Sequence, residues 1–146
     1  MGDPWSVDSL ERIVVAGVAL TTAALGQAQP GLELTLSQWR LLVVLMARTD
    51  PLSLTAVAAA TAVTLPATSR QVHRLADRGL IALAPNPRDR RSLEVSLTPA
   101  GRELHASVIT FRRSHLAEIV DAIEVTPAVE RALAQVADAL DPSPRR

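Results

Sequence analysis

The chain has 146 residues, no cysteine and a formal net charge of zero. This length fits one domain of common size, and the absence of cysteine excludes disulfides and thiolate metal sites. Apolar residues make up 48% of the chain and aromatic residues only 2%, a balance that favours closely packed helices over a β-sandwich.

The first apolar segment predicts a helix that ends near Gln27. Its inward-facing positions recur at steps of three and four residues, at Val7, Leu10, Val14, Gly17 or Val18, Thr21 and Leu25. Residues 13–32 carry no charge, which is also typical of a signal-peptide core or a membrane span. Gln27, Gln29 and Pro30 interrupt the apolar run before the ~20 residues that a span needs. We therefore expect a buried helix in a cytoplasmic protein with no membrane partner, and export is the alternative.

Two shorter helices are predicted next. Thr35 and Gln38 form a capping box, which starts a helix that runs to Met46. An Asp-Pro pair breaks this helix. A third helix is expected near residues 55–61, and residues 62–64 form a tight connection to the next helix.

The helix predicted over residues 64–78 has a basic side. Thr64 is the expected N-cap, Pro66 lies in the first turn, and Gly79 is expected to end the helix as a left-handed C′ residue. The residues expected to face inward are Val72, Leu75 and Ala76. The basic side carries Arg70, His73, Arg74 and Arg78.

A β-hairpin with a basic tip follows this helix. Apolar residues alternate with small or polar ones, a period of two that predicts strands, at Ile81 and Leu83 and then at Leu93, Val95 and Leu97. Two prolines around Asn86 turn the chain between the strands. The tip carries Arg88, Asp89, Arg90 and Arg91. A hairpin that projects three arginines is typical of the wing of a winged helix-turn-helix.

Two further helices are predicted after the hairpin. Thr98 offers an N-cap and Pro99 the first position of a long helix. Thr126 and Pro127 start a last helix in the same way. The tail, residues 142–146, is expected to be frayed.

The predicted fold class is mainly α with a small β-hairpin wing, in a single domain over residues 1–146. Residues 33–98 form a winged helix-turn-helix, and residues 1–30 and 99–141 supply helices whose apolar stripes this module cannot cover. Surplus apolar faces at both chain ends favour a symmetric dimer. The alternative is a self-contained monomeric bundle.

Positive charge is concentrated in residues 64–91. This segment holds six arginines against two acidic residues, a balance of +4, and the other segments hold nine arginines against thirteen, a balance of −4. DNA responds to the local field, so the asymmetry favours a DNA-binding face on a neutral body. A solvated basic surface without a ligand is the alternative.

In a helix-turn-helix the second helix enters the major groove by its N-terminal end. The candidate base or phosphate contacts at that end are Thr64, Leu65, Pro66, Ala67 and Ser69. Arg70 is the best candidate for a bidentate contact to guanine, and Arg74 is assigned to a phosphate. The alternative for Arg74 and Arg78 is solvation or an ion pair with Asp77.

On the wing, we expect Arg90 or Arg91 to enter the minor groove, where narrow A·T tracts concentrate negative potential. Arg88 belongs to the same contact surface. Asp89 is expected to orient a neighbouring arginine through a charge-assisted bond.

Other classes of function lack their motifs. The histidines at 73, 105 and 115 are too far apart in sequence to form a local metal-ligand motif, so neither a metal nor a cofactor is expected. A metal site in which His105 and His115 meet an acidic residue in the fold is the alternative. The sequence also has no Ser/His/Asp or Cys/His arrangement, no phosphate-binding glycine loop and no H-E-x-x-H pattern. An enzyme is therefore not expected.

The chain resembles the MarR family of transcriptional regulators. The matching stretches are Leu34-Thr35, residues 63–75, Gly79-Leu80-Ile81, Asp89-Arg90-Arg91 and residues 95–102. The resemblance implies a homodimer, built by the first and the last two helices, on pseudo-palindromic operator DNA. It also implies a repressor that releases DNA when a small aromatic or phenolic anion binds between the dimer and DNA-binding regions.

The resemblance places Trp39 near this effector pocket, and packing beneath the DNA-binding module is the alternative. The departures from the family pattern are Ala62 for a usual Gly, Leu83 and Ala84 for frequent arginines, and Ala56 and Ala59 for frequent glutamates. A winged-helix protein–protein adaptor with weak or lost DNA binding is the alternative function. The retained Asp89-Arg90-Arg91 disfavours it.

Overall fold

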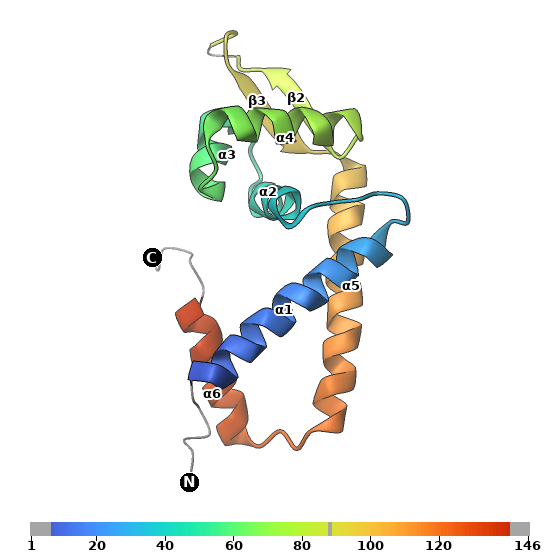
Figure 1. Cartoon of the computed structure of the whole chain (residues 1–146). Coiled ribbons are helices and arrows are strands. Elements are labelled where there is room, and N and C mark those ends of the chain that lie inside the picture. Colours follow the sequence, from blue (N-terminus) through green and yellow to red (C-terminus); the bar gives the residue numbers. More distant parts are fainter. Residues whose placement is uncertain (1–6, 88, 141–146) are drawn as a thin grey trace. The chain divides into compact units, whose positions relative to one another are not determined.

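The computed structural model describes residues 7–87 and 89–140. The chain forms two compact units, divided between Arg112 and Arg113. In chain order (Figure 1) its elements are α1 (Val7–Ala28), α2 (Leu36–Met46), β1 (Leu52–Ser53), α3 (Leu54–Thr61), α4 (Leu65–Asp77), β2 (Ile81–Pro85), β3 (Leu93–Leu97), α5 (Pro99–Ala122) and α6 (Pro127–Leu140). The predicted mainly α fold with a small β-hairpin wing is confirmed. The predicted role of the terminal helices in a dimer stays a prediction.

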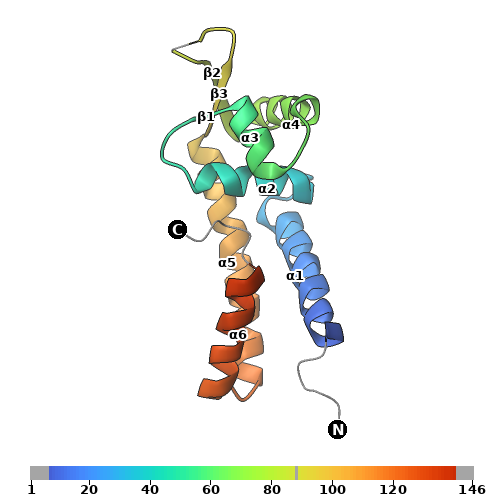
Figure 2. The ribbon, with the colours of Figure 1, turned by 90° about the vertical axis from the view of Figure 1, so that its left-hand side faces the viewer.

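A three-stranded antiparallel sheet in the order β1-β3-β2 lies in the first unit. The predicted hairpin is β2–β3, in which Ile81 pairs with Leu97 and Pro85 with Leu93. Its tip extends beyond α3 and α4 in both ribbon views (Figures 1 and 2). The strand β1, in which Leu52 pairs with Val95, is an addition to the predicted elements. A strand of two residues has no alternation to detect.

The core of the first unit joins α2, α3, α4, the sheet, the end of α1 and the first turns of α5. Its largest fully buried side chains are Leu41, Leu42, Leu75, Val57, Val72, Val95, Val108 and Thr68. The Oγ1 atom of Thr68 is buried without a hydrogen-bond partner among the described residues. The core therefore holds the inner face of α4 against the sheet and α3.

Local signals in the sequence explain where these helices begin and end. Both bonds of the Thr35–Gln38 capping box are present at the start of α2. Helix α3 begins one residue earlier than expected, because the side chain of Ser53 caps it by accepting a bond from the Ala56 amide. Gly79 ends α4 with φ +71°, the left-handed conformation expected of a C′ residue.

Helix α1 ends at Ala28, one residue beyond the predicted Gln27. Ala24 and Leu25 are its only buried residues in the part of the chain that the structure describes, so the expectation of a buried helix is wrong. Its 22 residues have a mean hydropathy of 1.4 over an 18-residue window, so by length and composition it is able to cross a membrane. The expectation that Gln27 and Pro30 shorten the apolar run below that limit is therefore wrong. The mostly buried core helix of a soluble protein and a signal sequence near the N-terminus pass the same test. The exposed apolar residues of α1 include Ile13, Val14, Val15 and Val18.

The second unit consists of the last turns of α5 and helix α6. No residue of α6 is fully buried, although its sequence is strongly amphipathic. The large apolar side chains exposed in this unit are Leu116, Ile119, Val120, Ile123, Val125, Leu133 and Leu140. The predicted surplus of apolar surface is thus present here and on α1.

Candidate nucleic-acid interface

Helix α4 begins at a tight turn after α3. Ala62 adopts φ +53° at the C-cap of α3, a left-handed conformation that favours glycine. Thr64 then has the extended N-cap conformation, and Pro66 lies in the first turn. Thr64 is therefore at the predicted N-cap position, but its side chain makes no capping hydrogen bond, and that part of the prediction is wrong. That hydroxyl lies at the N-terminal end of α4.

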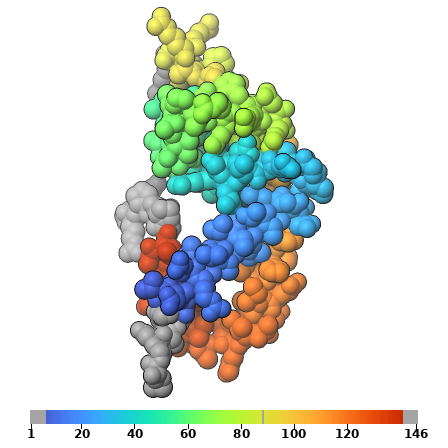
Figure 3. Space-filling model, in the orientation of Figure 1, coloured from blue at the N-terminus to red at the C-terminus, as the bar shows by residue number. Residues whose placement is uncertain are grey.

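The two faces of α4 differ sharply in character. Thr68, Val72 and Leu75 are buried, as the helical period requires, and Ala76 is half-buried. The exposed residues are Leu65, Pro66, Arg70, His73, Arg74 and Asp77, and Ala67 and Ser69 are half-buried. In the space-filling view this face of α4 is open, with the wing projecting above it (Figure 3). A basic, solvent-facing helix therefore lies beside the hairpin.

Side chains hold α4 to its neighbours. The Nε2 atom of Gln71 donates to Ser37 Oγ at 2.9 Å, which ties the middle of α4 to the start of α2. The Nδ1 atom of His73 lies 2.8 Å from the carbonyl oxygen of Ser69, and this bond directs the imidazole back along the helix. The sequence analysis placed His73 on the basic side of the helix but did not predict this contact with Ser69. The four-residue spacing between the two positions is the sequence feature that indicates it.

Hydrogen bonds organise the wing tip. The Asn86 amide donates to the Ser92 carbonyl, and the Ser92 amide donates to the Asp89 carbonyl, each at 2.9 Å. Asp89 Oδ1 accepts from the backbone amide of Arg91 at 3.1 Å. Asp89 therefore shapes the backbone of the turn, and no bond from its carboxylate to the guanidinium of Arg90 or Arg91 is found among the described residues. Its expected charge-assisted bond to a neighbouring arginine stays a prediction. Arg90 and Arg91 are exposed, and Arg88 lies outside the described residues.

Arg78 forms a contact that the sequence did not indicate. Its Nη1 atom donates to the carbonyl oxygen of Glu33 at 2.7 Å. Within the described ranges no ion pair joins Arg78 or Arg74 to Asp77. The ion-pair alternative is therefore absent here. Arg78 contacts the connection between α1 and α2.

Beneath α4, two aromatic rings join α2 to α5. Trp39 is 6% exposed, and its ring is stacked on His105 with centroids 5.1 Å apart and 15° between the planes. Burial lowers the pKa of His105, and the nearby positive charge of Arg112 lowers it further. The Nε atom of Arg112 is buried without a hydrogen-bond partner among the described residues. This cluster is cationic and aromatic.

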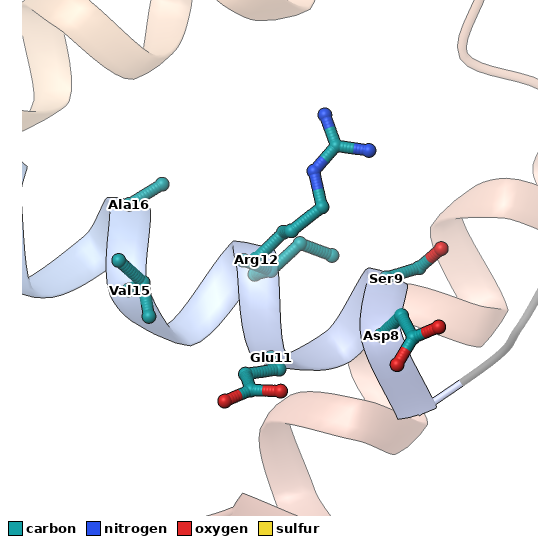
Figure 4. Close-up of a pocket in the computed structure, with 7 residues that line it drawn as sticks. Asp8, Ser9, Glu11, Arg12, Val15 and Ala16 are labelled. Carbon is teal, nitrogen blue, oxygen red and sulfur yellow. The ribbon is translucent and has the colours of Figure 1, made fainter.

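Two hollows are present in the first unit. One runs along the start of α1, and the described residues that line it, including Asp8, Ser9 and Arg12, belong to that helix (Figure 4). The other, of about 460 Å³, lies between the end of α1 and α5 and is lined by Gln27, Ala28, Ala106, Ser107, Thr110 and Phe111. Over residues 7–87 and 89–140, no three His, Asp or Glu side chains are grouped to hold a metal ion.

A three-helix module with an exposed basic second helix and a basic hairpin beside it defines a winged helix-turn-helix protein. The sequence model of the MarR family matches residues 32–92. The chain belongs to the MarR family of transcriptional regulators, whose members are regulators and not enzymes.

Solved structures agree with this assignment. The crystal structure of RV1404 from Mycobacterium tuberculosis is 30% identical, with a TM-score of 0.75 over 95% of this chain and 94% of that chain. A probable transcriptional regulator from Pseudomonas aeruginosa is also 30% identical, with a TM-score of 0.62 over 90% and 93%. Bordetella bronchiseptica BpsR is 26% identical, with a TM-score of 0.60 over 90% and 98%. No curated protein sequence matches the chain.

Proposed function

We propose that this protein is a ligand-responsive repressor that binds pseudo-palindromic operator DNA as a homodimer in the cytoplasm. The observation that carries the proposal is the open basic face of α4 beside a wing whose two described arginines are exposed. An anionic duplex fits a convex basic strip of this kind better than a small substrate does.

The N-terminal half of α4 reads bases in this proposal. Arg70 lies on the exposed face, where its guanidinium is free to make a bidentate contact to guanine. Leu65, Pro66 and Ala67 contact thymine methyl groups, and Thr64 and Ser69 contribute hydroxyls. Arg74, one turn further from the groove, contacts a phosphate.

The wing supplies the second contact. Because Asp89 and Ser92 fix the backbone of the turn, Arg90 and Arg91 reach the minor groove from a preorganised loop. Arg88 belongs to the same surface. Half-site spacing is set by the two-fold axis of the dimer.

The apolar surfaces of α1, α5 and α6 support a homodimer. Val15 on α1 and Val120 on α5 are 62% and 52% exposed, and exposed apolar area of this extent marks an association surface. Light scattering of the full chain at micromolar concentration is expected to give the mass of a dimer. A stable monomer over the same range contradicts this part of the proposal.

The effector in this proposal is a small aromatic or phenolic anion. In the similar protein BpsR, DNA binding is regulated by 6-hydroxynicotinic acid. In this chain the Arg112 guanidinium, whose buried Nε has no partner among the described residues, attracts an anion, and the imidazole of His105 donates a hydrogen bond to it. Trp39 reports on the anion through the stacked rings. Because Trp39 is buried, we assign it an indirect role in which His105 is the contact.

A DNA-binding assay tests the main proposal. Sequences are selected from a random duplex pool, and the chain's own upstream region is included as a candidate. Fluorescence anisotropy then compares the selected duplex with random DNA at several salt concentrations. Tight, salt-dependent and sequence-specific binding supports the proposal. Failure to bind any duplex overturns it and favours the protein–protein adaptor.

A second assay tests the effector. Aromatic carboxylic acids and phenols are screened by the fluorescence of a Trp5→Phe variant, in which Trp39 is the single indole. A true effector weakens operator binding with a coupling of ~1–3 kcal/mol, and operator DNA weakens effector binding by the same factor. A compound that quenches Trp39 without changing operator affinity contradicts the proposed response.

A further inference from the structure

The C-terminal end of α4 is bonded to two different connecting segments. Arg78 Nη1 donates to the Glu33 carbonyl, in the connection that leads to α1. One residue later, the Gly79 carbonyl accepts a bond of 2.6 Å from Thr98 Oγ1, immediately before α5. The recognition helix is therefore held at one end by both segments that lead out of the winged module.

The backbone around Arg78 is well defined. The Gly79 amide donates to the Ala76 carbonyl at 2.8 Å, and the Leu80 amide donates to the Leu75 carbonyl at 3.0 Å. These bonds close the end of α4 as a Schellman motif does. Because backbone bonds close the turn after it, the Cα–Cβ bond of Arg78 has a fixed direction at the C-cap. Its bond to a carbonyl oxygen is charge-assisted, which makes it stronger than a neutral bond of the same length.

Arg74 provides a direct contrast. It lies one turn earlier on the same helix and is exposed, but it has no hydrogen bond or ion pair among the described residues. A solvent-facing guanidinium of this kind is available to a phosphate. The Arg78 guanidinium is already engaged at the opposite end of α4 from the N-terminal residues.

We propose that Arg78 is a positioning residue for DNA recognition, which holds the α1–α2 connection against the C-terminal end of α4, and that it makes no phosphate contact. This inference rests on the proposed DNA-binding function. Removal of the bond frees the connection at residues 29–34, while the hydroxyl and the amide of Thr98 still bond to Gly79 and Leu80 at the end of α4. The recognition helices of a dimer then lose their defined spacing, and specific binding suffers more than non-specific binding.

The test compares Arg78→Met with Arg74→Met in the full-length chain. Methionine keeps most of the apolar stem and removes the donor, and Arg78→Lys restores a cationic donor. Glu33→Gln is the matched control, because the acceptor is the backbone carbonyl and not the Glu33 side chain. Amide hydrogen exchange of residues 29–34 is measured in the free protein, and salt-dependent DNA binding is measured on the selected duplex and on random DNA.

We expect Arg78→Met to speed exchange in residues 29–34 several-fold, and Arg78→Lys to restore protection. Arg78→Met should weaken operator binding about tenfold and leave the salt slope on random DNA unchanged. Arg74→Met should leave exchange unchanged and lower the salt slope by ~0.9, the value for one lost phosphate contact. Glu33→Gln should behave as the wild type in exchange.

Two results overturn the inference. One is an Arg78→Met protein with unchanged exchange and a salt slope lowered by ~0.9, which makes Arg78 a phosphate contact. The other is unchanged exchange with unchanged DNA binding, which makes the bond inconsequential. The exchange measurement needs no DNA, so it decides whether the bond holds the connection even if the proposed function fails.

Discussion

The indole of Trp39 and the imidazole of His105 are stacked with their centroids 5.1 Å apart. These residues are far apart in the sequence, and the contact joins α2 of the winged module to α5. Arg112, two turns further along α5, contributes to the lowered pKa of His105. Binding of a ligand or a proton at His105 therefore affects both α2, through Trp39, and α5.

The lowered pKa of His105 predicts a pH-dependent stability. Below the ordinary histidine pKa near 6.5 the unfolded chain binds a proton that the folded chain binds less readily, so the free energy of unfolding falls as pH decreases through this range. His105→Gln should lose this part of the pH dependence. Urea denaturation on both sides of that pH measures it, with His73→Gln as the control. An identical pH profile for wild type and His105→Gln contradicts the assignment.

Gly101 allows α5 to approach the end of α4. A Cβ atom at this position lies 2.1 Å from the carbonyl oxygen of Leu80, and a backbone atom cannot give way as a flexible side chain does. Gly101→Ala should therefore destabilise the fold by about 1–3 kcal/mol. Gly26→Ala in α1, where a Cβ meets nothing within 4 Å, is the matched control and should be neutral or stabilising. Equal denaturation midpoints for the two variants argue against the close approach.

Ala62 occupies a left-handed turn that favours glycine. Its φ of +53° carries a steric cost for any residue with a Cβ atom. Ala62→Gly should raise the free energy of unfolding by roughly 0.5–1 kcal/mol, the relief of strain exceeding the added entropy of the unfolded chain. Chemical denaturation measures the change, and a loss of stability shows that the turn is not left-handed.

Two substitutions of Asp89 separate its structural role in the wing from the effect of its charge. Asp89→Asn keeps an oxygen acceptor for the Arg91 amide and removes a negative charge from the proposed DNA-contact surface, so affinity for DNA should rise a few-fold. Asp89→Ala removes the acceptor as well, and the disordered turn should lower affinity. Anisotropy on the selected duplex compares the two. Equal affinities for both variants mean that the bond to Arg91 does not organise the wing.

Local signals made much of the fold predictable. The Thr35–Gln38 capping box, the left-handed Gly79 and the period of two in the hairpin each depend on residues a few positions apart. The exposed face of α4 follows in the same way from the helical period that buries Val72 and Leu75. The positions of Arg70 and Arg74 on that face were therefore predictable.

The remaining features depend on residues far apart in the sequence. The strand β1 exists only because Leu52 pairs with Val95, and the Arg78–Glu33 bond crosses 45 positions. Neither contact produces a periodic pattern in the sequence. The bond from the Arg91 amide to Asp89 was not predicted for a different reason. An acidic residue among arginines suggests an ion pair, whereas a tight turn also presents backbone amides to the carboxylate.

The central claim is that α4 reads the operator, and the most direct measurement is the affinity of Arg70→Ala and Arg74→Ala for operator and random duplexes. Arg70→Ala should lose roughly 1–3 kcal/mol on the operator and little on random DNA. Arg74→Ala should weaken binding to both duplexes equally and lower the salt slope by ~0.9. Equal losses on both duplexes for Arg70→Ala make Arg70 a phosphate contact, and unchanged operator affinity in both variants contradicts recognition by α4.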